Sequence, residues 1–207
     1  MRALRAGPLR RVAVLAFWAC AGGAAGAQSP DPYAERYARN CAACHGANGV
    51  SSTALTPSLA GQPSFYAITQ LFLFREGRRD SVPMTAVAKD MSNDDLRGYS
   101  AHIGKLAPPP PDSAPSGADA LRMERGATLT RKLHCTGCHG SDLSGGSQVP
   151  RLALQREDYL LHALRGFRAA SRVGYTPAMT EALAGVSPQD LEDLAHYMAR
   201  MPLAKAP

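Results

Sequence analysis

A five-residue pattern of two cysteines and a histidine occurs twice in the 207-residue chain, at residues 41–45 (CAACH) and 135–139 (CTGCH). Thiols three positions apart lie about one helical turn apart, so both can add to the vinyl groups on one edge of a porphyrin. The adjacent histidine can then ligate the iron, which makes this the signature of c-type haem attachment. The pattern therefore predicts two covalently bound haem c groups. The predicted attachment residues are Cys41, Cys44, Cys135 and Cys138, and the predicted iron ligands are His45 and His139.

Two other chemistries use paired cysteines at this spacing. Cys-x-x-Cys also forms half of many zinc sites and the redox centre of thioredoxin-like proteins. Zinc would take four thiolates and leave both following histidines without a role, and a catalytic dithiol would need only one copy. Haem explains every residue of both copies, so zinc and dithiol chemistry stay as the less favoured alternatives.

Residues 1–27 have the features of a Sec-type signal peptide. Basic residues precede a short apolar segment, and the ending Ala25-Gly26-Ala27 predicts cleavage before Gln28. The apolar segment is too short to anchor the chain in a bilayer, and nothing after it is long and apolar enough to span one. Lipidation of Cys20 is the less favoured alternative. We therefore expect a periplasmic protein, with peripheral membrane association left open.

Cleavage of this segment changes the charge and the cysteine count. It removes four of the 23 basic side chains and none of the 17 acidic ones, so the formal net charge falls from +6 to +2. The basic balance is thus mostly a targeting feature, and we expect no nucleic-acid partner. The four remaining cysteines all belong to the two motifs, which leaves none for a structural disulfide.

The two halves of the remaining chain form an internal repeat. After each motif, a loop rich in glycine and serine leads to Pro-x-Leu-Ala, at 57–60 and 150–153. A carbonyl in such a loop is a natural acceptor for the second ring N–H of the ligating histidine. Apolar residues at helical spacing then predict helices over 64–75 and 157–168, each ending in an arginine-rich turn. Those arginines could reach haem propionates or a partner, or form a solvated helix end.

Start signals predict two further helices in each half. Asp31 and Pro32 predict the start of a helix that runs into the first motif. In the second half, residues 118–133 are predicted to form the corresponding helix before the second motif. Ser92 and Ser187 begin the last helices with capping-box patterns. Three helices in each half and little strand signal predict an all-α fold. The proline-rich segment 108–117 reads as a linker between domains at 28–107 and 118–207.

Methionines at one repeat position are the predicted sixth ligands of the two irons. Met84 and Met179 lie on proline-containing loops before the last helices, and methionine is a soft donor that raises the reduction potential. Met91 aligns with Val186, so that position requires only an apolar side chain. The alternative is that Met84 and Met179 only fill gaps in the core. Four other histidines have no clear repeat partner and are predicted to be structural: His102, His134, His162 and His196.

Several of these motifs together resemble cytochrome c4. They are CAACHG, the PSLAGQ run at 57–62, the Phe-Arg-x-Gly-x-Arg run at 74–79, Pro83-Met84 and the Ser-x-x-Asp-Leu start of the last helix. The resemblance covers essentially all of the chain after Ala27. It implies two tandem class I cytochrome c domains, each wrapped round one covalent haem with histidine and methionine ligands. It also implies a periplasmic electron carrier that takes electrons from a quinol–cytochrome c reductase or dehydrogenase and passes them to a terminal oxidase or another acceptor.

Other function classes remain open. The chain could be the haem-bearing, electron-accepting subunit of a flavin-dependent dehydrogenase, because flavocytochromes that oxidise sulfide carry similar dihaem subunits. It could also be an enzyme that acts at a haem. A peroxidase needs an open coordination site, however, and thiosulfate dehydrogenases of this kind use a cysteine ligand. The matched methionines and the fully used cysteines argue against both, so we predict no catalytic residue.

Overall fold

The computed structural model describes residues 31–172 and 177–201. The predicted signal peptide and its cleavage point lie outside these residues. The chain from Asp31 onward groups into one compact unit, and the predicted domain boundaries at 107 and 118 remain predictions.

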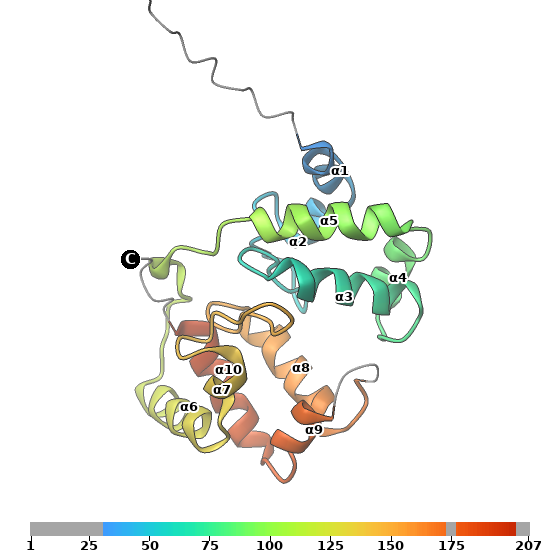
Figure 1. Ribbon diagram of the computed structural model, residues 1–207. Helices are drawn as coiled ribbons and strands as arrows, with labels where there is room; N and C mark the ends of the chain where they lie inside the picture. The colour runs from blue at the N-terminus through green and yellow to red at the C-terminus, as the bar shows by residue number, and fades with distance from the viewer. Residues whose placement is uncertain (1–30, 173–176, 202–207) are drawn as a thin grey trace, which may run out of the picture. The chain divides into compact units, whose positions relative to one another are not determined.

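Ten α-helices and one 3₁₀ helix make up the described residues, and none of those residues forms a strand. Figure 1 shows the first five helices in blue to green and the last five in yellow to red. The first half contains α1 (Pro32–Asn40), α2 (Ala42–His45), α3 (Ser64–Arg75), α4 (Val82–Ala88) and α5 (Asn93–Lys105). The second half contains α6 (Ala120–Lys132), α7 (Cys135–His139), α8 (Glu157–Arg168), α9 (Ala178–Ala182) and α10 (Pro188–Arg200). The 3₁₀ helix, η1 (Pro111–Ser113), lies in the proline-rich segment between the halves. The all-α prediction is confirmed.

The three helices predicted for each half are present as α1, α3 and α5, and as α6, α8 and α10. The short helices α4 and α9 correct the prediction that Met84 and Met179 lie on loops. Ser81 caps α4 by accepting the Met84 N–H at 3.4 Å, and Pro83 fits its first turn. Helices of seven and five residues are too short to show a periodic pattern in the sequence.

The predicted helix starts are confirmed. The Asp31 carboxylate accepts the Tyr33 N–H at 3.0 Å at the start of α1. At α5, Ser92 and Asp95 form both bonds of a capping box. At α10, only the forward bond of the box forms among the described residues, from the Asp190 N–H to the Ser187 hydroxyl at 3.1 Å.

The cores of the two halves are organised differently. The second half has one continuous cluster, which α8 and α10 supply in large part. The first half has two smaller clusters, one around Tyr37 and one around Tyr99. Cys41 packs against both first-half clusters, and Cys135 packs against the second-half cluster. Each motif therefore presents its first cysteine to the apolar core of its own half.

Candidate haem-binding sites

The two motif histidines are held in the same way. His45 and His139 end α2 and α7, and each is only 6% exposed. The His45 Nδ1–H donates to the Pro57 carbonyl at 2.9 Å, and the His139 Nδ1–H donates to the Pro150 carbonyl at 2.9 Å. A carbonyl can only accept, so Nδ1 carries the proton and Nε2 keeps the lone pair that binds a metal. The predicted loop acceptor is confirmed in both halves.

Burial also keeps these imidazoles neutral. Desolvation lowers the pKa of His45 and of His139, against the opposing effect of the carbonyl bond. The charge of Arg79 lowers the pKa of His45 further. Neutral imidazole is the form that ligates iron, so the electrostatics of both sites fit a metal ligand.

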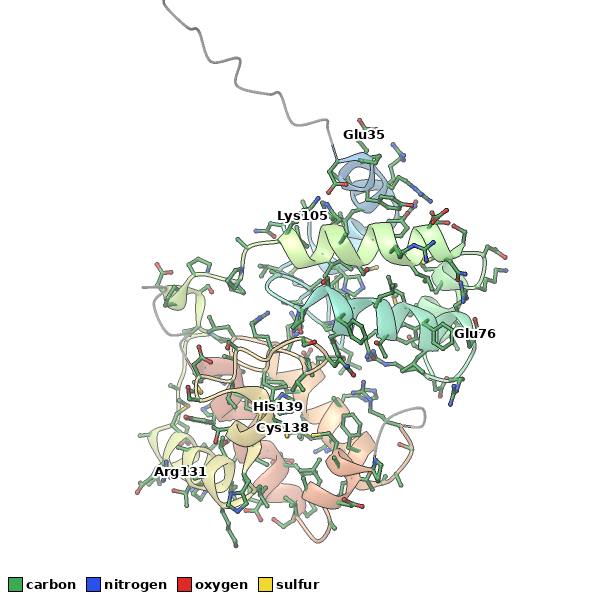
Figure 2. The ribbon with its side chains drawn as sticks, viewed as in Figure 1. Glu35, Glu76, Lys105, Arg131, Cys138 and His139 are labelled. Atoms are coloured by element: carbon green, nitrogen blue, oxygen red, sulfur yellow. The ribbon has the colours of Figure 1, made fainter. Side chains whose placement is uncertain are left out.

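The cysteines do not have the surroundings of a catalytic dithiol. Cys41 and Cys135 are half-buried, whereas Cys44 and Cys138 are exposed. Burial raises the pKa of Cys41 to about 11 and also raises that of Cys135. A reactive dithiol needs the opposite shift. Figure 2 shows Cys138 and His139 together on the short α7.

A zinc site is not supported either. No group of three or more His, Cys, Asp or Glu side chains in residues 31–172 and 177–201 is placed to hold a metal ion. Each motif instead offers two free thiols and one oriented imidazole, which is the donor set of a covalently attached haem.

The glycine after each motif is required by the backbone. Gly46 and Gly140 have φ angles of +83° and +84°, in the region that favours glycine. A Cβ on Gly46 would lie 2.1 Å from the Val50 carbonyl oxygen. The Gly46 carbonyl also accepts the Tyr37 hydroxyl at 3.0 Å, which ties the end of the motif to α1.

The structure brings both predicted methionine ligands to the cores that contact the motifs. Met84 packs against the Leu71, Leu96 and Tyr99 cluster, which Cys41 also contacts. Met179 packs against the second-half core, which Cys135 also contacts. Met91 shares the first-half cluster with Met84, so packing alone does not separate the two. The assignment of Met84 and Met179 continues to rest on the repeat.

The arginine-rich turns have structural roles that the sequence did not reveal. Arg75 donates to the Met91 carbonyl at 3.2 Å, and Arg168 donates to the Val186 carbonyl at 3.2 Å. Met91 and Val186 occupy the same repeat position, so each arginine joins the end of its helix to the start of the last helix. Four residues after these arginines, the guanidinium groups of Arg79 and Arg172 lie over the rings of Phe74 and Phe167.

Two glutamines to which the sequence assigned no role connect the halves. Gln62 and Gln155 are buried, and each bonds to the Pro-x-Leu-Ala loop of the opposite half. Their equal spacing of five residues after Pro57 and Pro150 was the available signal. The sequence could not indicate that the contacts run between halves.

Comparison with known proteins places these sites in a family. A family model for cytochrome c matches residues 123–202, and one described as cytochrome c oxidase, cbb3-type, subunit III matches residues 28–103. The chain is 32% identical over 185 residues to a cytochrome c4 of Thiocapsa roseopersicina, covering 84% of this chain and 95% of that protein. This chain belongs to the cytochrome c4 family.

Two further comparisons cover most of the chain. The crystal structure of reduced recombinant cytochrome c4 from Pseudomonas stutzeri matches with a TM-score of 0.73 at 28% identity, covering 82% of this chain and 97% of that one. A protein named thiosulfate dehydrogenase electron acceptor, from Thiomonas intermedia, is 30% identical over 95% of this chain and 94% of its own length.

As a member of the cytochrome c4 family, the protein is a dihaem electron carrier with covalently bound haem c, and not an enzyme. Its function requires redox partners. Among the residues that the structure describes, no helix combines the length and the apolar character needed to cross a membrane.

Proposed function

We propose that this cytochrome c4 passes single electrons through two haems, each attached by the two cysteines of its motif and ligated by one histidine and one methionine. His45 and Met84 are the ligands of the first iron, and His139 and Met179 are those of the second. The observation that carries this proposal is the matched pair of 2.9 Å bonds that orient both histidines.

Backbone carbonyls and burial prepare both histidines to bind iron. When bound, haem supplies a one-electron iron couple. The proline carbonyls hold both imidazoles in one orientation and one tautomer, and burial keeps them neutral. Met84 and Met179, as the second protein ligands, would raise the potential and would leave no coordination position for a substrate. These roles suit reversible electron transfer better than chemistry at the metal.

The test is a spectrum and a redox titration of the purified full chain. We expect low-spin, six-coordinate haem in both oxidation states and two reversible one-electron couples. A high-spin fraction comparable to one haem would contradict the second methionine ligand in one half.

We also infer a periplasmic location and respiratory partners. The pattern of residues 1–27 supports export. The resemblance to cytochrome c4 implies a donor such as a quinol–cytochrome c reductase and an acceptor such as a terminal oxidase. The mature protein should be recovered from the periplasmic fraction, and its mass should be that of a chain that begins at Gln28 with two haems attached. A chain that keeps residues 1–27 would contradict cleavage.

A second candidate function is to accept electrons from a thiosulfate-oxidising enzyme. The relative named thiosulfate dehydrogenase electron acceptor supports it, because that match spans 94% of its length. Stopped-flow reduction decides between donors. The rate of haem reduction is compared for three donor systems at equal enzyme concentration. These are thiosulfate with purified thiosulfate dehydrogenase, sulfide with a flavin-dependent dehydrogenase, and quinol with a quinol–cytochrome c reductase.

A further inference from the structure

The two glutamines that connect the halves each bind one backbone segment by both of its hydrogen-bonding groups. The Gln155 amide oxygen accepts the Ser58 N–H at 2.7 Å, and its amide nitrogen donates to the Ser58 carbonyl at 2.8 Å. In the opposite direction, Gln62 accepts the Arg151 N–H at 3.1 Å and donates to the Arg151 carbonyl at 3.0 Å. All four residues are buried. The arrangement is reciprocal, because each half supplies one glutamine and one bound segment.

Each bound segment adjoins the carbonyl that orients a histidine. Ser58 follows Pro57, and Arg151 follows Pro150. The carbonyl of Pro57 and the N–H of Ser58 are the two ends of a single peptide group. One continuous chain of hydrogen bonds therefore runs from Gln155 through that peptide to the Nδ1–H of His45.

The second half contains the same chain of bonds. It runs from Gln62 through the Pro150–Arg151 peptide to the Nδ1–H of His139. In both cases the glutamine and the histidine belong to different halves. The bonded residues are separated by about half the chain, so the link exists only in the folded protein.

Bonds in such a chain reinforce one another. An acceptor at the N–H end polarises the peptide and makes its carbonyl oxygen a stronger acceptor. A stronger bond at Nδ1 gives the imidazole more anionic character and makes Nε2 a better donor to the metal. A better donor stabilises the oxidised iron and lowers the reduction potential.

We propose that Gln62 and Gln155 are positioning residues for the axial histidine of the opposite half, and that each lowers the reduction potential of the haem in that opposite half. The proposal rests on the proposed roles of His45 and His139 as iron ligands. Each haem is thus tuned by a residue from the other half, and the two sites are coupled through the contact between halves. The shorter 2.7 Å bond of Gln155 implies that its effect is the larger.

The test uses the full-length dihaem protein with Gln155→Met and Gln62→Met, which keep side-chain length and remove the amide. Gln155→Met should raise the potential of the first haem relative to the second. The expected change in electron distribution is about threefold, which is about 28 mV at 59 mV per tenfold for one electron. Gln62→Met should shift the second haem instead, by less. The two variants are therefore each other's matched control.

A second readout reports on the histidine directly. In the reduced protein, the NMR signal of the His45 Nδ1–H should move towards a weaker hydrogen bond in Gln155→Met, while that of His139 stays in place. If Gln155→Met is not recovered with two haems, Gln155→Glu, which keeps an oxygen acceptor for the Ser58 N–H, should retain the His45 signal and should not raise the first potential.

The outcomes separate this proposal from the proposed function. Equal shifts at both haems, a shift only in the half that carries the mutation, or no shift at all would overturn the positioning role. A wild-type protein without histidine-ligated low-spin haem would overturn the proposed function itself.

Discussion

The two halves of the molecule hold their histidines identically but pack the supporting helices in opposite ways. Where α1 meets α5, the close approach is at Gly98, and a Cβ there would lie 1.9 Å from the Tyr33 ring. Where α6 meets α10, the glycine lies on the other partner, and a Cβ on Gly126 would lie 2.4 Å from the Asp193 carbonyl oxygen. The hydrogen bonds that orient His45 and His139 are therefore the same in both halves, whereas the supporting helices pack differently in each half.

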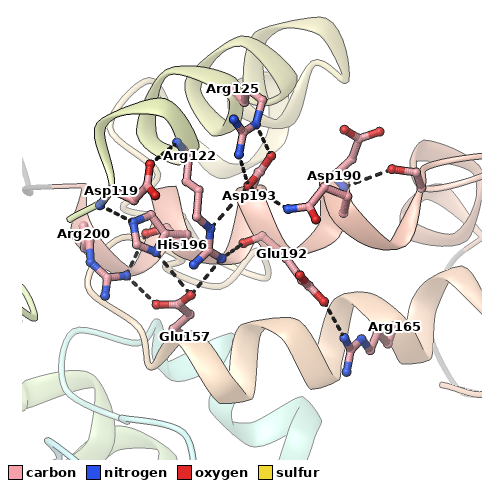
Figure 3. A network of polar contacts seen from close by, with 12 residues as sticks. Asp119, Arg122, Arg125, Glu157, Arg165, Asp190, Glu192, Asp193, His196 and Arg200 are labelled. Atoms are coloured by element: carbon pink, nitrogen blue, oxygen red, sulfur yellow. Dashed lines mark hydrogen bonds and ion pairs between the residues drawn. The ribbon is translucent and has the colours of Figure 1, made fainter. Parts of the chain in front are cut away.

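The scaffold also differs in its polar content. In the second half, a partly buried ionic network centred on Asp193 joins α6, α8 and α10 (Figure 3). Asp193 is fully buried and binds Arg125 at 2.6 Å and Arg122 at 3.4 Å. Glu157 contacts Arg122, His196 and Arg200 in the same network. In the first half, smaller ionic contacts join the last helix to Asp31 and to Arg36 of α1, and the edge-to-face pair of Tyr33 and Tyr99 packs beside them.

Removing the centre of this network should have the largest effect on stability. Asp193→Ala leaves the guanidinium groups of Arg122 and Arg125 without their shared carboxylate and opens a cavity at a fully buried position. We expect unfolding of the second half to become easier by about 3 kcal/mol. Urea unfolding followed by circular dichroism measures the change. A loss below about 1 kcal/mol would show that the network contributes little.

The two glycines at the helix crossings should respond unequally to alanine. Gly126→Ala should cost about 2 kcal/mol, because the obstacle is backbone and the helices must separate. Gly98→Ala should cost less, because the obstacle is the far end of the Tyr33 side chain, which can shift, and not backbone. The paired unfolding curves test the comparison directly. A larger loss from Gly98→Ala would mean that the Tyr33 packing is the more rigid crossing.

One residue distinguishes the loops that orient the two histidines. Arg151 takes the place of Ser58, is 1% exposed, and donates from Nε and Nη2 to the Ala60 carbonyl of the other half at 3.1 and 2.7 Å. Burial lowers its pKa to about 10, so it stays charged at neutral pH. A buried positive charge beside the second site favours the reduced state of that haem.

Arg151→Met should therefore lower the potential of the second haem relative to the first. The expected change in electron distribution is about tenfold, or about 59 mV for one electron. The titration that resolves the two couples measures it, with Ser58→Ala as the uncharged counterpart in the first half. A second-haem potential that is unchanged or higher would remove Arg151 as a source of the difference between the sites.

The smallest expected effect concerns the capping boxes. The Ser92 N–H bond, with help from Arg36 at 2.5 Å, lowers the pKa of Asp95 to about 2. Because the folded pKa is below the unfolded value of about 3.9, this stability is present above pH 4 and is lost as the pH falls towards 2. Asp95→Asn should remove about 1 kcal/mol at pH 6 and clearly less at pH 2, where the carboxylate is about half protonated. A loss that does not depend on pH would contradict the charge-based account.

The sequence predicted those features that local chemistry determines. The motifs and the capping residues act within a few residues, and the repeated prolines lie 12 and 11 positions after their histidines. All six long helices and the carbonyl acceptors for His45 and His139 therefore followed from the sequence pattern. The short helices of Met84 and Met179 did not, because so few residues show no period. The roles of Gln62, Gln155 and Arg151 could not be predicted, since their partners lie about half the chain away and only folding brings them together.

The measurement that most directly tests the account is the methionine–iron charge-transfer band of the oxidised protein in single alanine variants. Met84→Ala and Met179→Ala should each remove about half of the band and lower the potential of one haem only. Met91→Ala and Val186→Ala, at the neighbouring repeat position, should leave the band intact. If Met91→Ala removes it and Met84→Ala does not, the repeat alignment that assigns both methionine ligands is wrong.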